Sequence, residues 1–323
     1  MSSHDAAPAA GRPVPPAAYG HLLVIYIVWG AAYLAVKLCL TGPATITTLQ
    51  LQSSRMWLAA ALLAGLMLLR LGPPPRLSHR DLFFCAASGI MMWVAGNGLA
   101  TVASRHAASS FIVMALGAIP LWSSLLDLFM SGARPSRQLM AGLLVGLAGL
   151  VLVVVPPLLT SDAGMLDPGY APVTVLMLAG AGLTWSFGTL LQRPLSGRAE
   201  PGWIAVYQLV AAATVLTPPM LIEHAPLPHG ASLVQLGAFA FLVVFGSVIG
   251  MTSFIKVTRS FGPAIASTFA YVNPVVGILL GWLVRDEAPA ALSLVGMAIV
   301  LAGIAVVLNR PVRAGGVQPK AKS

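Results

Sequence analysis

Long apolar stretches constrain the fold of this chain more than any other feature of its sequence. A helix needs roughly 20 apolar residues to cross a hydrocarbon core of about 30 Å. Strands of a membrane barrel would be only about ten residues long and would alternate in polarity, which these stretches do not. We therefore expect an all-α integral membrane protein with ten transmembrane helices, at about residues 20–40, 45–69, 82–104, 108–130, 138–158, 172–192, 202–222, 233–255, 262–284 and 289–309.

An internal repeat accompanies these stretches. The repeated pairs are Pro120 and Pro274, Pro135 and Pro289, Gly142 and Gly296, Gly149 and Gly303, and Arg105 and Arg259, all 154 positions apart, with Trp29 and Lys37 echoed by Trp185 and Arg193 at an offset of 156. Each copy holds five predicted helices, and an odd number forces the two copies to lie in the membrane with opposite orientations. The sequence predicts two inverted five-helix repeats, at residues 20–158 and 172–309. Secondary transporters use such repeats, because exchanging the conformations of the halves opens a cavity to either side.

The distribution of basic residues predicts the orientation of the chain. Of 18 Lys and Arg residues, only Lys37, Arg55, Arg105 and Arg285 fall outside the segments that lie in the cytoplasm when the N-terminus is placed there. The positive-inside rule then places both termini in the cytoplasm, and the resemblance given below implies that the membrane is a bacterial-type inner membrane. We expect the tails at 1–19 and 310–323 to be disordered. Because the basic residues follow the membrane orientation and form no soluble patch, the pI near 10.2 does not indicate a nucleic-acid partner.

Polar and aromatic stripes on the predicted helices are candidates for a substrate site. Tyr26, Trp29, Tyr33 and Lys37 share one helical face by their spacing of three or four, as do Trp93, Asn97 and Thr101. In the second half, Trp185 and Thr189 share a face, and Ser267, Tyr271 and Asn273 gather in one helix. A polar stripe has no reason to face lipid, so we predict that Trp29, Tyr33, Trp93, Asn97, Trp185, Tyr271 and Asn273 contact substrate. The alternative is that the aromatic residues form an interfacial belt.

Two equivalent prolines suggest a mechanical role. Pro120 and Pro274 each remove a backbone donor in mid-helix and free a carbonyl four residues earlier. One interpretation is a gating bend shared by the two halves, and the other is a packing kink without any ligand contact.

Three charged residues have possible roles. Asp127 is the one carboxylate within a predicted helix, and a structural ion pair with Arg134 or Arg137 is favoured over proton transfer. Arg55 is the most deeply placed base and either holds the bundle together or touches substrate. Lys37 either reaches the outer headgroups or serves transport.

Several signatures of other functions are absent from the sequence. It has no P-loop, HExxH or CxxC motif, and no Ser-His pair within the apolar stretches. We therefore predict no metal, no cofactor and no catalytic residues, and the expected partners are a small-molecule substrate and the lipid bilayer.

Four short passages resemble the drug/metabolite transporter superfamily and its ten-span EamA family. They are residues 29–33 (WGAAY), 96–98 (GNG), 185–188 (WSFG) and 270–276 (AYVNPVV), and the resemblance extends from about residue 20 to 309. It implies ten helices in two inverted five-helix repeats around a central cavity, and export of small metabolites or drugs. Members commonly carry an acidic residue after the fourth and ninth helices. Here Glu287 retains it in the second half, while Gly132 and Ala133 replace it in the first.

These observations together predict a secondary transporter that exports small amphipathic solutes, amino-acid-like or aromatic, by alternating access. Two alternatives remain at this stage. One is a facilitative channel, although no ring of like charges is visible. The other is an integral-membrane enzyme, for which no nucleophile and base are apparent in the sequence.

Overall fold

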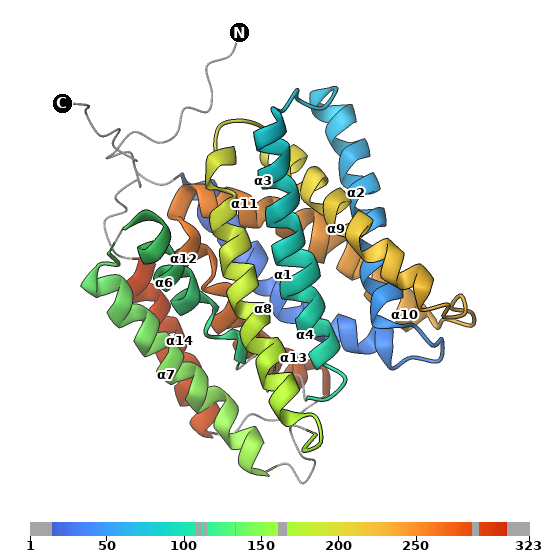
Figure 1. Ribbon diagram of the computed structural model, residues 1–323. Coiled ribbons are helices and arrows are strands. Elements are labelled where there is room, and N and C mark those ends of the chain that lie inside the picture. Colours follow the sequence, from blue (N-terminus) through green and yellow to red (C-terminus); the bar gives the residue numbers. More distant parts are fainter. Residues whose placement is uncertain are drawn as a thin grey trace, which may run out of the picture.

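The computed structural model describes residues 15–107, 112, 115–132, 134–160, 167–285 and 291–308, and within these ranges the chain is helical without a β-strand (Figure 1). Most of both predicted tails, at 1–14 and 309–323, lies outside the described residues, as does Glu287. The helices are α1 (Pro16–Leu40), α2 (Thr48–Leu71), α3 (His79–Gly89), η1 (Ile90–Asn97), α4 (Gly98–Ala103), α6 (Ile119–Ser131), α7 (Arg137–Thr160), α8 (Ala171–Leu191), η2 (Arg193–Leu195), α9 (Pro201–Ile222), α10 (Leu233–Phe241), η3 (Leu242–Ile249), α11 (Gly250–Phe261), α12 (Pro263–Ala266), α13 (Phe269–Arg285) and α14 (Ala291–Leu308).

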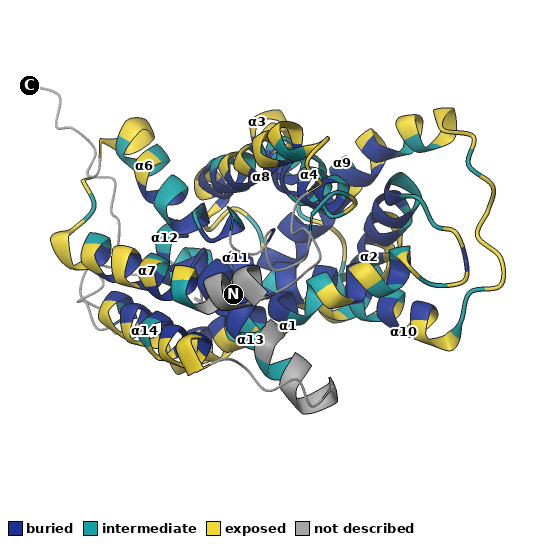
Figure 2. Cartoon of the chain, turned by 90° about the horizontal axis from the view of Figure 1, so that it is seen from below, coloured by how far each residue is buried: buried dark blue, intermediate teal, exposed yellow. Residues whose placement is uncertain are grey.

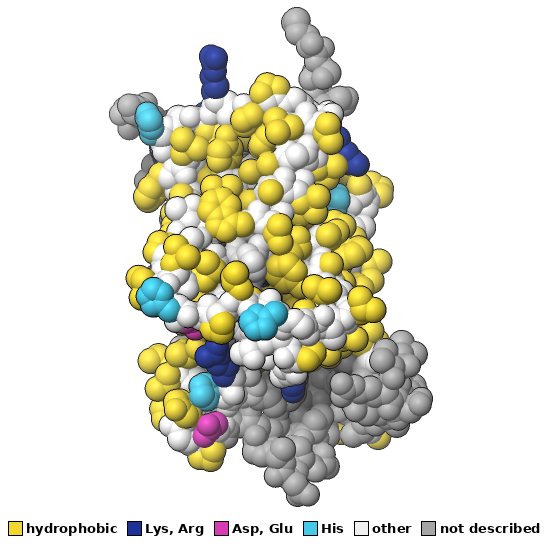
Figure 3. Space-filling view, turned by 90° about the vertical axis from the view of Figure 1, so that its right-hand side faces the viewer, with side chains coloured by type: hydrophobic (Ala, Val, Ile, Leu, Met, Phe, Trp, Pro, Cys, Tyr) yellow, Lys and Arg dark blue, Asp and Glu magenta, His cyan; other side chains and the backbone are white. Residues whose placement is uncertain are grey.

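Seven of the described helices are long and apolar enough to cross a membrane. They are Pro16–Leu40, Thr48–Leu71, His79–Ala103, Ala171–Leu195, Pro201–Ile222, Leu233–Phe261 and Ala291–Leu308, and two shorter apolar helices lie at Ile119–Ser131 and Arg137–Leu152. On the face drawn in Figure 3, hydrophobic side chains cover the middle of the molecule and charged side chains lie toward its two ends. Figure 2 shows buried residues on the inward sides of the helices and exposed residues on their outward sides. This pattern is typical of a helical membrane protein.

The helices begin where capping chemistry favours a start. Pro16 occupies the first turn of α1, where a missing N–H costs nothing and the fixed φ suits a helix. The prediction of a tail up to residue 19 was therefore wrong at its end, because α1 begins at Pro16. Ser78 and Ser232 cap α3 and α10, and each hydroxyl accepts the backbone N–H three residues on. These two caps are 154 residues apart.

Glycines allow the closest helix pair, α7 against α14, which lies at the left of Figure 1. A Cβ added to Gly149 would come 2.6 Å from the backbone nitrogen of Val300, and one added to Gly303 would come 2.6 Å from that of Gly146. Side chains at these positions would force the backbones apart.

Two π-helical turns were not predicted, and they shape the centre of the bundle. η1 spans Ile90–Asn97 and η3 spans Leu242–Ile249, each eight residues long and 152 positions apart. A π-turn widens the helix and changes the direction in which the following side chains point, and such turns are frequent at functional sites. Trp93 and Asn97 lie on η1, and Gly246 and Ser247 on η3.

The two repeated prolines differ in their surroundings, so the prediction of a shared mid-helix bend was wrong. Pro120 is the second residue of α6, where its missing N–H breaks no hydrogen bond. Pro274 lies inside α13. The predicted helix at 262–284 is interrupted earlier, at Ser267 and Thr268, between α12 and α13. Tertiary contacts at these two hydroxyl residues, described below, hold that interruption.

Candidate substrate cavity

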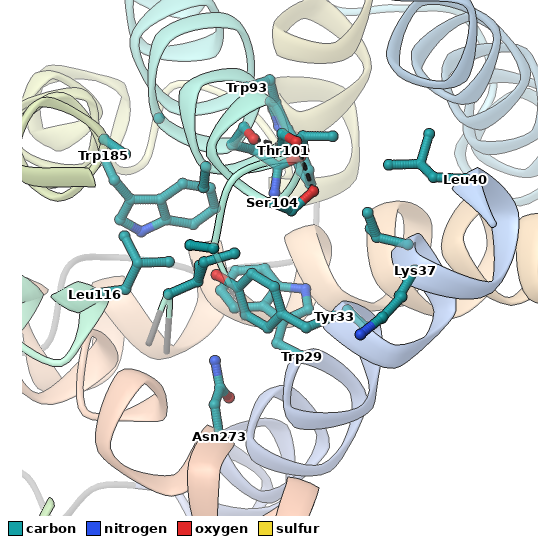
Figure 4. A pocket seen from close by; sticks show the side chains of 18 of the residues that line it. Trp29, Tyr33, Lys37, Leu40, Trp93, Thr101, Ser104, Leu116, Trp185 and Asn273 are labelled. Carbon is teal, nitrogen blue, oxygen red and sulfur yellow. Dashed lines mark hydrogen bonds between the residues drawn. The ribbon is translucent and has the colours of Figure 1, made fainter. Parts of the chain in front are cut away.

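A cavity of about 440 Å³ lies among helices from both halves of the chain. Its size is within the range of small-molecule sites. Figure 4 shows side chains of α1, α4, α8, α13 and η1 converging on it. The lining includes the predicted site residues Trp29, Tyr33, Lys37, Arg55, Trp93, Asn97, Trp185 and Asn273. For Trp29, Tyr33, Trp93, Asn97 and Trp185 the helical spacing had predicted inward faces, and the structure brings those faces together.

Aromatic rings make the closed end of the cavity, which we call the floor: Trp29, Trp93, Trp185 and Phe269. The centroid of the Trp29 ring lies 4.6 Å from that of Phe269 and 5.3 Å from that of Trp185, and the centroids of Trp93 and Trp185 are 5.9 Å apart. All three contacts are edge-to-face, the arrangement that aromatic quadrupoles favour. The floor is thus a rigid apolar surface on which a flat ligand group could stack.

Glycines leave space for Trp29 and Trp185, the two tryptophans that occupy equivalent positions in the repeat. The indole nitrogen of Trp29 donates to the Gly246 carbonyl at 2.9 Å, and it lies 2.5 Å from where a Cβ of Gly250 would stand. Trp185 packs on Gly96, 154 positions before Gly250, but with Cβ and Cε3 of its side chain, each 3.3 Å from where a Cβ of Gly96 would stand. The π-helices carry or adjoin these glycines, which explains the close approach.

One wall of the cavity carries a network of amide groups. Gln52, which we had not singled out from the sequence, donates to the side-chain oxygen of Asn97 at 2.7 Å and to the Thr101 hydroxyl at 2.6 Å. Since the oxygen of Asn97 is occupied, its NH₂ group is the part free to meet a ligand. Asn273 is 4% exposed, and its side-chain oxygen has no hydrogen-bond partner among the described residues. The indole nitrogens of Trp93 and Trp185 likewise lack one.

Arg55 lies deepest among the cationic residues of the cavity and is 2% exposed. Its Nε donates to the hydroxyl of Ser247 at 2.9 Å, and that hydroxyl donates onward to the Leu242 carbonyl. One terminal nitrogen contacts the side-chain oxygen of Asn97 at 3.5 Å, and the guanidinium carbon lies 5.1 Å from the centroid of the Trp93 ring. Arg55 therefore joins α2 to η3 and also lines the cavity, while its contact with substrate stays a prediction.

The cavity reaches the surface at the C-terminal ends of α1 and α4. The exposed lining residues there are Lys37, Thr41 and Arg105. The lining residues near the floor are buried by contrast, with Ile119, Ala181 and Trp185 each less than 8% exposed. We call the exposed end the mouth.

A chain of buried hydroxyls closes the end opposite the mouth. Ser186 donates to the carbonyl of Ile119 at 3.1 Å, so it can only accept from Ser123, which lies 3.1 Å away. Ser123 in turn accepts from Ser267, also at 3.1 Å. The chain joins α6, α8 and the break before α13, and its three serines are at most 1% exposed. The sequence did not predict this arrangement, because the three serines are far apart in the chain and form no recognisable motif.

Two further contacts reinforce this closure. The hydroxyl of Tyr26 donates to Thr268 at 2.7 Å, because the Thr268 hydrogen is already given to the Ile265 carbonyl. Asp127 accepts two hydrogen bonds from Arg193, each 2.6 Å long. The prediction of an ion pair at Asp127 thus holds, but its expected partners, Arg134 and Arg137, were wrong. Arg193 follows α8 and reaches across to α6, which the sequence spacing could not show.

Tyr271 does not line the cavity. Its hydroxyl donates to the Leu143 carbonyl at 2.9 Å, and its ring packs on Gly146 of α7. Tyr271 is two residues before Asn273, so the two side chains leave α13 on different sides. The position of Tyr271 therefore gives it a packing role.

Within the described residues, no three His, Cys, Asp or Glu side chains come close enough to hold a metal ion. Cys39 and Cys85 are both buried and not joined to each other.

Comparison with known proteins now adds to this geometry. Residues 172–309 match the model of the EamA-like transporter family, and 27% identity to a transporter extends over 291 residues, 90% of this chain and 90% of the relative. The second half of the chain therefore carries an EamA-family domain. That relative is the uncharacterized inner membrane transporter YedA of Escherichia coli.

Two further likenesses span nearly the whole chain. A probable terminal-alkyne amino-acid exporter of Streptantibioticus cattleyicolor is 26% identical over 301 residues, covering 90% of this chain and 92% of that protein. A solved crystal structure, described only as that of a protein, has a TM-score of 0.73 at 20% identity over 90% of this chain and 96% of its own. At that identity the likeness concerns the fold alone.

Proposed function

We propose that this protein is a secondary transporter that exports small amphipathic solutes, amino-acid-like or aromatic, by alternating access. The observation that carries the proposal is the cavity: it reaches the middle of the bundle, is exposed at the mouth, and is closed at the other end by polar contacts. Alternating access requires a central site that one end exposes while the other is sealed.

The proposal includes a topology of ten spans in two inverted repeats, at residues 20–158 and 172–309, with both termini in the cytoplasm of an inner membrane. Equivalent contacts support it. Trp29 packs on Gly250 as Trp185 packs on Gly96, and the π-helices η1 and η3 occupy corresponding places. In this topology the mouth faces outward and the Asp127–Arg193 end faces the cytoplasm.

The solute class follows from the cavity lining and from the names of the relatives. Trp29, Trp93 and Trp185 would stack on an apolar group, while Asn97 and Asn273 would orient the polar end. YedA is named as an inner membrane transporter, and the S. cattleyicolor relative as a probable amino-acid exporter. The first name agrees with transport across an inner membrane, and the second agrees with an amino-acid-like solute.

Counterflow in proteoliposomes tests the proposal. Vesicles loaded with unlabelled phenylalanine or 3-phenylpropionate should take up the same labelled solute transiently above its equilibrium level, because a carrier exchanges solute at a saturable site. A channel would give no such overshoot, so its absence for every solute of this class would reject the transporter.

An imposed pH gradient then tests whether transport is coupled to protons. We expect unchanged rates, since Asp127 is held by Arg193 and lies outside the cavity lining.

A matched pair of variants tests the site. Trp185→Ala should abolish counterflow, because the side chain contacts both Trp29 and Trp93 on the floor. Trp57→Ala is the control, since that tryptophan is 44% exposed on α2 and outside the lining. Equal loss in both variants at normal expression would remove the floor from the transport path.

A further inference from the structure

The charges around the cavity are all of one sign among the described residues. Lys37 and Arg105 stand at the mouth and Arg55 near the floor, and the lining contains no Asp or Glu. A low-dielectric cavity with only positive charges focuses a field that attracts anions and repels cations. The aromatic floor limits the size of the apolar part of a solute, and the positive charges determine which polar group that solute can carry.

Arg55 is under-satisfied for a buried cation. A guanidinium presents five N–H donors in a planar fork. Two described contacts engage it, to Ser247 and, over a long 3.5 Å, to Asn97, and neither partner is charged. No described carboxylate forms an ion pair with it. Buried charges are normally paired, and an unpaired one inside a membrane protein marks a functional site.

We propose that Arg55 binds the carboxylate of the transported solute, so that this cavity selects apolar or aromatic monocarboxylates. This inference rests on the proposed function and names the solute class for its site. The guanidinium fork matches the two oxygens of a carboxylate, which a point charge does not. Trp93 lies against the guanidinium and leads to Trp185, so a carboxylate at Arg55 leaves the body of the solute on the floor.

The neighbouring orphan donors fit the same ligand. The indole N–H groups of Trp93 and Trp185 are buried without described partners, and both line the cavity. Donors left unsatisfied in a buried site cost free energy until a ligand accepts from them. Carboxylate oxygens have about four lone-pair sites, enough to accept from Arg55 and from an indole together.

The other half of the molecule limits the solute to one such anchor. The residue equivalent to Arg55 by an offset of 153 is Gln208, which is neutral, fully buried and hydrogen-bonded to Ser88 at 2.8 Å. The cavity therefore offers one deep anion site. The lining also holds no carboxylate to pair with an ammonium group, and the unpartnered oxygen of Asn273 offers it only a neutral acceptor, so the charge that this site recognises is negative.

A binding experiment tests the carboxylate independently of transport. The probes are 3-phenylpropionate and 2-phenylethylamine, which share a ring and chain length but end in a carboxylate or an ammonium. Purified wild-type protein is titrated with each, and quenching of tryptophan fluorescence is followed. We expect saturable quenching by 3-phenylpropionate and at least about tenfold weaker binding of 2-phenylethylamine, since a charge-assisted hydrogen-bonded pair is replaced by repulsion.

Variants then assign the effect to Arg55. Arg55→Gln, which copies the neutral Gln208 of the other half, should weaken 3-phenylpropionate binding by about tenfold or more, and Arg55→Lys should restore part of it. Arg70→Gln is the matched control, because it removes a cation from the exposed end of the same helix.

The outcomes separate this inference from the function on which it rests. Equal affinity for the two probes, no saturable binding of 3-phenylpropionate, or an Arg55→Gln variant that binds it unchanged would each overturn the carboxylate site, even if counterflow of other solutes is found. The wild-type comparison of probes needs no variant, so misfolding of Arg55→Gln would not protect the inference. Tight binding of 3-phenylpropionate without any counterflow would instead support the site and reject the transporter.

Discussion

The closed end of the cavity and the equivalent positions in the other half of the chain have opposite chemistry. The closed end is held by Tyr26, Ser123, Ser186, Ser267 and Thr268. With the proposed repeat offsets of 154 and 156, the equivalent residues of the other half are Gly182, Gly277, Gly30, Val113 and Met114. Three of the five are glycines, Val113 is apolar, and Met114 offers only a weakly accepting sulfur, so none of them can donate a hydrogen bond from its side chain.

The same asymmetry extends to the ion pair. Arg193 corresponds to Lys37, which keeps the positive charge, but Asp127 corresponds to Gly281. An inverted repeat would let the mouth close in the manner of the opposite end, but here the two closures cannot have equal strength. Opening the closed end breaks buried hydrogen bonds, whereas the equivalent residues of the other half offer mainly apolar packing. We infer that the two halves can share a fold while differences in their side chains favour the state in which one particular end is closed.

Gly30 gives the largest expected effect in a test of this comparison, because it is the counterpart of Ser186 and has no room for a side chain. A Cβ there would lie 2.6 Å from the Cβ of Val276 on α13. Gly30→Ser, which places the serine of the other half at the equivalent position, should destabilise the protein by about 3 kcal/mol through overpacking. The midpoint of thermal unfolding in detergent measures this loss.

Controls for this variant come from the same helix and from its neighbour. Gly20→Ser should have little effect, since a Cβ at Gly20 meets nothing within 4 Å. Adding Val276→Ala to Gly30→Ser should recover part of the loss. If Gly30→Ser is as stable as Gly20→Ser, then sterics do not maintain the difference between the two ends.

Ser123 gives the next effect, at the closed end itself. Ser123→Ala removes an acceptor for Ser267 and a donor to Ser186, at a cost of about 2 kcal/mol to the closed state, or roughly a thirtyfold rise in opening. A cysteine introduced at the buried lining residue Ala181 reports opening when an impermeant thiol reagent is applied only at the membrane face on which Arg193 lies. Its labelling rate should rise by the same factor.

Ser54→Ala is the control for that measurement. Its hydroxyl bonds only to carbonyls of its own helix, with the shorter bond to Gln50. Labelling that rises equally in both variants, or in neither, would show that the hydroxyl chain does not keep this end shut.

The helical stretches and much of the cavity were predictable from the sequence because both depend on periodicity. A spacing of three or four sets Trp29 and Tyr33 on one face, and lipid excludes Asn97 and Asn273 from the outside of the bundle. That these residues line a cavity is an observation, while their contact with substrate stays a prediction.

Three details could not be predicted from the sequence, because they depend on how the helices are rotated and where they are interrupted. Tyr271 turns toward Gly146, a glycine of another helix that leaves space for its ring. Asp127 finds Arg193, which is 66 positions away, rather than a neighbour in sequence. The break at Ser267 requires the partner Ser123, and no local pattern at either residue signals the other.

Breaking the Asp127–Arg193 pair should increase opening of the closed end least, because exposure to water weakens the attraction between the two charges. Two parallel 2.6 Å bonds make it bidentate, yet the side chains of Arg193 and Asp127 are 36% and 26% exposed, so water screens the attraction. Asp127→Asn and Arg193→Gln should each raise the labelling of the Ala181 cysteine only a few-fold, corresponding to about 1 kcal/mol or less. The double variant should add nothing further, because either single change already breaks the pair.

Two controls follow. Higher ionic strength should reduce the difference in labelling between each variant and wild type. Arg198→Gln, an exposed neighbour in the same loop, should leave labelling unchanged. A rise as large as that of Ser123→Ala would mean that charge, rather than the buried hydroxyls, keeps this end closed, and the missing acid at Gly281 would then become the main difference between the two ends.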